Sequence, residues 1–327
     1  MRYYNIQLSQ PNGTPVYLKS LQGNPLTSLT AGGQFNPGAL QIELNIPLYP
    51  HSTGDAAHSY VEIWGIGLAD LTHQADFNNL NISVYGGMSA GLPLANPQQA
   101  GLLVQGTIFQ CFGNWLGTKQ SLTFVIGPTV GTPGTPPANV PFTWQAGTPL
   151  SVALRNLFDI AFPNLESVIT ISPKLVLNYP ETGYYQGLKP FSQWLLQRTQ
   201  GFTGPDYSGV YIAISGTKIL AFDNSTTPAT TTQINPQDLV GQPTWLSLNT
   251  MNFKTVMRAD IKLGAVVQLP PTIIQQNAAS QAQYRNQMTF NGMVKIIAAQ
   301  HFGNFRQPSA DSWVTSFQAA VPPVSSN

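Results

Sequence analysis

The stretch Leu40-Gln41-Ile42-Glu43-Leu44-Asn45-Ile46-Pro47-Leu48 decides the fold class, because its even positions are apolar and most of its odd positions are polar. Alternation with a period of two is typical of a strand with one buried face. The same pattern recurs in Leu80–Val84 and in Leu122–Ile126, and the longer apolar run from Leu102 to Phe112 is typical of a central strand. Clusters of Gly, Pro and Asn separate these runs. We therefore predict an antiparallel sheet that closes into a β-barrel.

Formal charges are scarce and balanced, which excludes several classes of protein. Lys, Arg, Asp and Glu make up 8% of the 327 residues, and the formal net charge is +1. Such a chain offers no basic surface to nucleic acid phosphates, and its 42% of hydrophobic residues are too many for a disordered protein. The sequence contains no run of about 18 apolar residues, the length that a membrane-spanning helix needs. The segment after Met1 lacks the apolar core of a signal peptide. A single cysteine, Cys111, excludes an internal disulfide framework and a cysteine-based zinc site. We expect a soluble globular protein made in a cytosol.

The distribution of the charges favours assembly with other protein. Between Asp76 and Arg155 the only formal charge is Lys119. A free domain normally carries interspersed charges on its surface, whereas the core of a subunit interface is depleted of them. The long uncharged stretch therefore indicates a contact surface. A neutral, amide-rich surface that tolerates the lack of charge is the simpler alternative.

Two segments dense in Gly, Pro, Ser and Thr, residues 127–137 and 223–232, have the composition of linkers. They divide the chain into a first β-barrel domain over residues 1–127, a middle α+β domain with flanking linkers over residues 128–237, and a second strand-rich domain over residues 238–327. No repeat of fixed period is apparent.

The middle part changes from a period of two to steps of three and four. Thr148 and Pro149 are expected to cap a helix whose apolar stripe runs from Leu150 to Ala161 and which Pro163 ends. A second helix is predicted from Pro190 to Gly201. The predicted strands of this part are Val168–Ile171, Lys174–Leu177, Val210–Ile214 and Lys218–Phe222, the last two forming a hairpin.

The C-terminal part returns to strands. We predict them at Ile261–Leu269, Met293–Ala299 and Trp313–Ala319. The polar segment Pro270–Gln287, rich in Gln and Ala, is expected to be a long loop or excursion with room for one helical turn.

Two motifs resemble catalytic or metal sites without meeting their requirements. Gly87-Met88-Ser89-Ala90-Gly91 matches the nucleophile elbow of hydrolases, but prolines follow it where that motif needs a helix. His51, Asp55 and His58 could approach one metal ion, yet zinc sites want three or four well-placed ligands, and His73 lies in a different segment. There is no Walker sequence and no dinucleotide-binding glycine motif. We predict no catalytic residue, no cofactor-binding residue and no metal ligand.

Four aromatic residues leave a binding alternative open. Tyr179, Tyr184, Tyr185 and Trp194 could stack on a sugar ring. Aromatic side chains bury large areas, however, so packing in the core of the small middle domain is the favoured interpretation.

Several segments, taken in their order along the chain, resemble the baseplate hub proteins of contractile-tailed bacteriophages. Near the C-terminus, Gly292–Arg306 is similar to a strand that runs into a turn beginning at His301, and Asp311–Phe317 opens the last strand with Trp313. Further matching segments are Asp238–Thr244, Lys262–Leu269, Asn79–Gly87, Gly106–Ile108 and Ser121–Gly127. The resemblance covers most of the chain.

This resemblance implies a mainly β protein with a smaller α+β part, in which two tube-type antiparallel β-barrels flank the middle α+β domain. It implies a homotrimer whose six barrels form a pseudo-sixfold ring that connects the hexameric tail tube to the trimeric central spike. His301 and Trp313 would then serve as a turn residue and a barrel-core anchor.

The partners that the resemblance implies are further copies of the chain, the tail tube protein or a tube adaptor, the central spike protein and other baseplate proteins. DNA would at most pass through the lumen. The protein would be located in the tail baseplate of the virion after assembly in the host bacterial cytoplasm, and it would not be an enzyme. The alternatives are a carbohydrate-binding virion module that uses the tyrosines and a serine hydrolase that uses Ser89.

Overall fold

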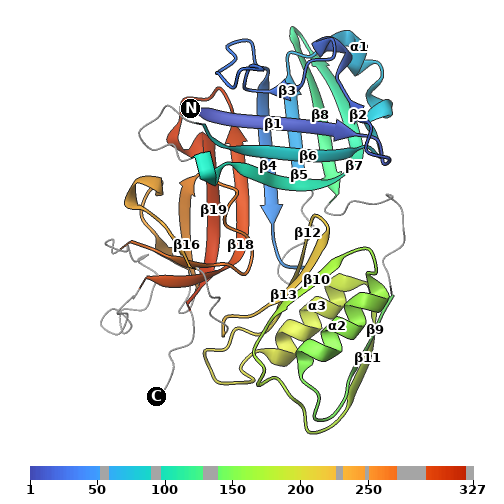
Figure 1. Ribbon diagram of the computed structural model, residues 1–327, viewed down its shortest axis with the longest axis vertical. Helices are drawn as coiled ribbons and strands as arrows, with labels where there is room; N and C mark the ends of the chain where they lie inside the picture. Colours follow the sequence, from blue (N-terminus) through green and yellow to red (C-terminus); the bar gives the residue numbers. More distant parts are fainter. Residues whose placement is uncertain are drawn as a thin grey trace.

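A computed structural model describes residues 1–51, 59–89, 97–127, 139–225, 231–246, 250–270 and 292–321. An N-terminal sheet, a middle part with helices and a C-terminal sheet lie side by side (Figure 1). Strands dominate the described residues, and the longer helices belong to the middle part. The predicted fold class, mainly β with a smaller α+β part, is confirmed.

The N-terminal sheet follows the alternation of its sequence. Its strands are β1 (Arg2–Ser9), β2 (Pro15–Val16), β3 (Leu26–Thr27), β4 (Gln41–Leu48), β5 (Ser59–Trp64), β6 (Asn81–Met88), β7 (Gly101–Leu116) and β8 (Lys119–Gly127). They run in the order β4-β5-β8-β7-β6-β1, and β2 and β3 both pair with β1. The helix α1 (Leu68–Leu71) and the 3-10 turns η1 (Lys19–Leu21), η2 (Gln74–Phe77) and η3 (Pro97–Gln99) connect them. The expected apolar positions are buried in one core, among them Ile42, Ile82 and Phe124. All neighbouring strands of this sheet are antiparallel, as predicted.

The middle part is a three-layer arrangement around two helices (Figure 1). Its elements are β9 (Asn139–Trp144), α2 (Leu150–Ala161), β10 (Glu166–Thr170), β11 (Glu181–Gln186), α3 (Leu188–Thr199), β12 (Tyr211–Ser215) and β13 (Lys218–Phe222). The helices lie between the β9–β11 ribbon and the sheet β10-β13-β12, in which β10 and β13 are parallel. The apolar stripe of α2, including Leu154 and Phe158, is buried as predicted.

Three details of the middle part differ from the sequence prediction. Residues 174–177 form no strand, because only an isolated bridge between Pro149 and Val176 pairs them. The N-cap position of α2 is Pro149, and no side chain caps it. Helix α3 begins at Leu188, before Pro190, because a proline is tolerated in the first turn of a helix, where amides lack helical partners.

The C-terminal sheet contains β14 (Thr232–Gln233), β15 (Thr244–Trp245), β16 (Thr250–Val256), β17 (Val266–Gln268), β18 (Met293–Asn304) and β19 (Trp313–Ala320), with the 3-10 turns η4 (Pro236–Asp238) and η6 (Ala310–Ser312). Its order is β15-β16-β19-β18-β17-β14. The strand predicted from Ile261 is confined to β17, because the chain turns at Gly264, whose φ is +77°. The segment predicted as a loop, Pro270–Gln287, lies outside the described residues after Pro270.

The long strand β18 joins the two sheets. Its first residues, Met293–Lys295, pair with β17, and its second half, Ala299–Asn304, pairs with β4 of the N-terminal sheet. The described strands of both sheets therefore form one 14-stranded sheet. Phe305 and Trp313 from the C-terminal part are buried in the N-terminal core, so the two parts also share side-chain packing.

Candidate assembly surface

The two sheets repeat the same topology. Five strands run in the order β4-β5-β8-β7-β6 in the N-terminal sheet and β15-β16-β19-β18-β17 in the C-terminal sheet. Each of these neighbouring pairs is antiparallel in both sheets. The repeat ends beyond them, because β1 is antiparallel to β6 whereas β14 is parallel to β17.

The register of the two sheets also matches. Each long strand carries one register shift against its hairpin partner, after Ile108 in β7 and after Ile296 in β18. Placing Ile108 on Ile296 aligns both ladders throughout: their partners Ile126 and Ala319 coincide, and so do Cys111 with Ala299 and Phe124 with Phe317. All eight side chains are buried. The repeat thus extends to individual core positions.

A shared turn before β6 and β17 gives independent support. The backbone is left-handed at Asn79 (φ 67°) and at Gly264 (φ 77°), the corresponding residues before the two strands. The amide of Asn79 donates to the carbonyl of Ile108 at 2.9 Å, and the amide of Gly264 donates to the carbonyl of Ile296 at 2.8 Å. Asparagine and glycine are the residues that most readily adopt this conformation. The two sheets therefore have the same topology and register but few residue types in common.

The two copies differ in the second half of the long strand. Both halves pair with their hairpin partner, β19 or β8, but the other edge of β18 pairs with β4, whereas no described strand pairs with the other edge of β7, which ends at Leu116. Phe109, Phe112, Trp115 and Leu116, which we call the hairpin surface, expose 47–68% of their area. This surface lies in the stretch whose only formal charge is Lys119. Exposed aromatic side chains without charges are typical of protein–protein contact sites.

Side chains form hydrogen bonds to the edge of β7 that has no described strand beside it in this half. The amide of Cys111 donates to Asn78 Oδ1 at 2.9 Å, and the amide of Gly113 donates to Gln74 Oε1. These two amides correspond to those of Ala299 and His301, which lie opposite β4 in the other sheet. Unpaired strand edges invite uncontrolled association. The two amide side chains thus occupy the positions that a paired strand occupies in the C-terminal sheet.

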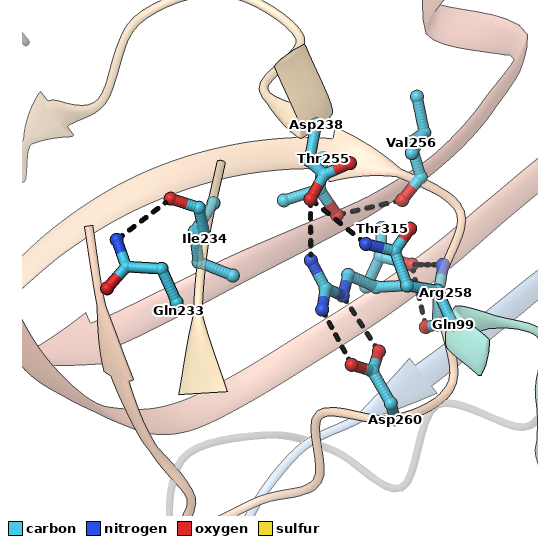
Figure 2. Close-up of polar contacts among 9 residues, drawn as sticks. All are labelled: Gln99, Gln233, Ile234, Asp238, Thr255, Val256, Arg258, Asp260 and Thr315. Carbon is cyan, nitrogen blue, oxygen red and sulfur yellow. Dashed lines mark hydrogen bonds and ion pairs between the residues drawn. The ribbon is translucent and has the colours of Figure 1, made fainter. Parts of the chain in front are cut away.

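A buried polar cluster fixes the junction between the sheets (Figure 2). The Arg258 guanidinium donates to both carboxylate oxygens of Asp260, at 2.8 and 2.6 Å, and lies 3.4 Å from Asp238 Oδ2. Gln99 of η3 in the N-terminal part donates to the same Asp238 oxygen at 2.9 Å. Only about 2% of the Arg258 side chain is exposed. The cluster therefore connects η3 to the C-terminal sheet through charge-assisted bonds, with Arg258 and Asp238 buried and Asp260 at the solvent side.

His301 is a buried, neutral member of the same region. Its Nδ1 lies 2.9 Å from Thr315 Oγ1. The Thr315 hydroxyl oxygen accepts a hydrogen bond from the backbone amide of Arg258 at 3.1 Å. Burial, together with the nearby Lys262 charge, lowers the pKa of His301 to about 3. His301 lies within β18, so its expected place in a turn is wrong. Trp313 lies in the N-terminal core, in agreement with its expected role as a core anchor.

Among the described residues, those of the alternative chemistries form no catalytic or metal site. The Ser89 hydroxyl donates to the carbonyl of Met1 at 3.1 Å, and the remainder of its motif, Ala90 and Gly91, lies outside the described residues. Asp55 and His58 also lie outside them, whereas His51 lies after β4 and His73 is exposed beside η2. Within the described part of the chain, no three His, Cys, Asp or Glu side chains cluster as a metal site would require. Also within that part, no helix is long and apolar enough to cross a membrane.

The four aromatic residues fall into two groups. Tyr185 and Trp194 pack against Phe191 with ring centroids 5.3 and 6.0 Å away, in the core of the middle part. Tyr179 and Tyr184 are exposed, and Tyr179 accepts a bond from Arg198. The core interpretation is therefore confirmed for the first two and wrong for Tyr179 and Tyr184; Tyr184 lies on the outer face of β11.

Comparison with known proteins gives structural likeness without sequence likeness. No family model and no curated protein matches the chain. Among solved structures, the chain is similar to the c3393 protein of Escherichia coli, a type VI secretion component described as resembling the bacteriophage T4 tail proteins gp27 and gp5 (10% identity, 88% of this chain and 74% of that one, TM-score 0.48). It is also similar to a tail protein of Neisseria meningitidis (8% identity, 97% and 96%, TM-score 0.46) and to the 43 kDa tail protein of prophage MuSo2 of Shewanella oneidensis (8% identity, 97% and 97%, TM-score 0.47).

These solved structures are described as tail and type VI secretion proteins. With every TM-score below 0.5, the function proposed below rests on the strands and contacts of this chain.

Proposed function

We propose that the chain is a structural baseplate hub subunit, three copies of which form a ring that connects a hexameric tail tube to a trimeric spike. The observation that carries this proposal is the repeat of one sheet, with matching register, at the two ends of the chain. Three chains with two equivalent sheets each supply six similar units around one axis. A ring of this kind presents sixfold features to one neighbour and threefold features to the other.

The physical advantage of the arrangement lies in its symmetry. A cyclic homotrimer uses one kind of head-to-tail interface three times and closes without further protein. The internal contact between β4 and β18 would then alternate with an equivalent contact between chains. The near absence of charge between Asp76 and Arg155 supports such contacts, because neutral surface is buried at a small desolvation cost.

The proposed role requires no catalysis and no cofactor, and it places the protein in the tail of a virion. Its partners would be two further copies of the chain, the tube protein or its adaptor, the spike and other baseplate proteins, with assembly in the host cytoplasm. The three domains that we propose are residues 1–127, 128–237 and 238–327.

A second candidate, binding of a neutral glycan by the middle part, rests on Tyr184 alone. Its ring is 64% exposed on the outer face of the β9–β11 ribbon, across from Pro141. Aromatic rings on flat, uncharged surfaces can stack on sugars. Loss of glycan binding on Tyr184→Ala, with assembly unchanged, would support this candidate.

Electron microscopy of the purified protein tests the proposed hub. We expect ring-shaped particles with threefold symmetry and six similar lobes around a central hole. Single three-lobed chains without a ring, at every concentration used, would overturn the proposal.

A further inference from the structure

We propose that the strand edge at β15 of one copy, residues 242–246, docks along the hairpin surface of the next copy and places Leu246 opposite Phe112. The inference rests on the proposed ring and names the surfaces that form it. Within the described part of a chain, β15 is the last strand at one end of the sheet, with β16 on its inner side. No other described strand pairs with its outer edge, where we place the second copy.

The template for this contact is the junction inside one chain. There, β4 lies antiparallel to the second half of β18, with Pro47 opposite Gln300 and Asn45 opposite Phe302. On its other side β4 pairs with β5. In the N-terminal sheet β4 is thus the first strand of the five-strand repeat, and it covers the long strand of the other copy of that repeat.

The repeat then identifies the equivalent residues for the contact between chains. Asn45 pairs with Tyr60, and Thr244 pairs with Asn252 at the corresponding position, so Thr244 is the equivalent of Asn45. Leu246 is consequently the equivalent of Pro47. Because Cys111 corresponds to Ala299, Phe112 corresponds to Gln300. The pair Pro47–Gln300 inside a chain becomes Leu246–Phe112 between chains.

The exposure of these two residues agrees with the assignment. Leu246 is 51% exposed and Phe112 is 47% exposed, although both are apolar. The equivalence was built from strand order and register alone, without regard to side-chain type. It nevertheless brings two exposed apolar side chains together, and it places Trp115 opposite Pro243 by the same count. Burial of such pairs is the usual source of interface stability.

The hydrogen bonds of Asn78 and Gln74 to the edge of β7 would have to be exchanged when the contact between chains forms. In the free chain they satisfy the amides of Cys111 and Gly113. In the ring, the same count places residue 245 of the neighbouring β15 edge opposite Gly113, so its carbonyl group would take over the Gly113 amide, as β4 does along β18. Exchange of a side-chain acceptor for a backbone acceptor keeps this donor satisfied. The side chains therefore protect the edge until a copy of correct register arrives.

The geometry of the pair allows a direct test by disulfide formation. The neighbouring amides of Cys111 and Gly113 face the outer edge, so that of Phe112 faces β8, and a pair with Leu246 is of the non-hydrogen-bonded kind. Residues in such pairs have Cα atoms about 4.5 Å apart, within the range of about 4.4–6.8 Å that a disulfide spans. The native thiol of Cys111 is buried and is best removed by Cys111→Ala.

The experiment is oxidation of Phe112→Cys/Leu246→Cys in the Cys111→Ala background, followed on non-reducing gels. We expect covalent dimers and trimers to form at least tenfold faster than in the control Ile160→Cys/Leu246→Cys, since Ile160 is 77% exposed on α2, outside the proposed contact. A trimer in light scattering that cross-links no faster than the control would overturn this interface and leave the ring. A monomer at every concentration would overturn the ring itself.

A second variant covers the case in which the cysteines perturb folding. Phe112→Glu places a charge at the centre of the contact and should shift the trimer to monomers, whereas Ile160→Glu should leave its mass unchanged. Equal masses for both variants, with unchanged circular dichroism, would contradict the assignment of Phe112.

Discussion

The indole nitrogen of Trp313 donates a hydrogen bond to the carbonyl oxygen of Gly87 at 2.8 Å, and the two residues are 226 positions apart. Trp313 opens β19 of the C-terminal sheet, while Gly87 lies near the end of β6. The indole ring also packs on Gly303, where a Cβ atom would lie 2.7 Å from it. One aromatic side chain thus holds the end of one sheet inside the core of the other.

Replacement of this indole should cost stability. In Trp313→Phe the carbonyl of Gly87 loses its buried donor, and we expect a loss of about 1–3 kcal/mol in the free energy of unfolding. The matched control is Tyr179→Phe, whose hydroxyl accepts a hydrogen bond from Arg198 on an exposed surface outside the proposed contact, where water can replace it. Urea unfolding of both variants checks the difference. Equal losses would show that the Trp313 bond contributes nothing particular.

Loss of the Arg258 charge should lower the free energy of unfolding far more than loss of an exposed cation. Arg258→Met leaves Asp238 and Asp260 without their guanidinium partner, and removal of one partner of a buried ion pair costs about 3–5 kcal/mol. Lys254→Met breaks the exposed pair with Asp311 and should cost about 0–1 kcal/mol. The measurement is again the free energy of unfolding in urea. A stable Arg258→Met variant would contradict the role of the cluster in holding the junction.

Substitutions on the buried and the exposed face of α2 should lower the free energy of unfolding by different amounts. Leu154 is fully buried, so Leu154→Ala should lower the free energy of unfolding by about 2–5 kcal/mol. Ile160→Ala, on the exposed side of the same helix, should change it by about 0.5 kcal/mol or less. Thermal melts that do not separate the two variants would show that the helix packs with another face.

His301 should make the protein less stable in acid. The pKa of its imidazole is about 3 in the folded chain because of burial, against about 6.5 when unfolded. Below pH 6.5 the unfolded chain therefore binds a proton that the folded chain does not, and stability falls by at most about 1.4 kcal/mol for each pH unit. His301→Gln removes this contribution. Between pH 6 and pH 4.5 its free energy of unfolding should fall less steeply than that of the parent chain, and parallel slopes would contradict the assignment.

The sequence predicts those elements whose burial follows a regular period. Leu40–Leu48 and the stripe from Leu150 to Ala161 became β4 and α2, because each buries one face. No strand is predicted at β9, although Val140, Phe142 and Trp144 alternate; Pro141 within it is a residue that central strands exclude. Proline is tolerated there because β9 forms a two-stranded ribbon with β11 and leaves one edge without a ladder partner in the described chain.

The assembly surface was predictable only in part. The scarcity of charge between Asp76 and Arg155 indicated a contact region, and the hairpin surface lies inside it. The repeat could not be predicted in detail, because most matched positions share a backbone register without sharing a residue type: Cys111 corresponds to Ala299, and Asn79 to Gly264. The junction cluster brings Gln99 to Asp238, 139 residues away, and no local pattern records such a contact.

The measurement that tests the central claim most directly is the mass of the purified protein by light scattering after size-exclusion chromatography. The repeated sheets predict a single species of about 106 kDa, three times the 35.4 kDa chain. A mass of one chain at all concentrations, or of any number of chains other than three, would contradict the ring.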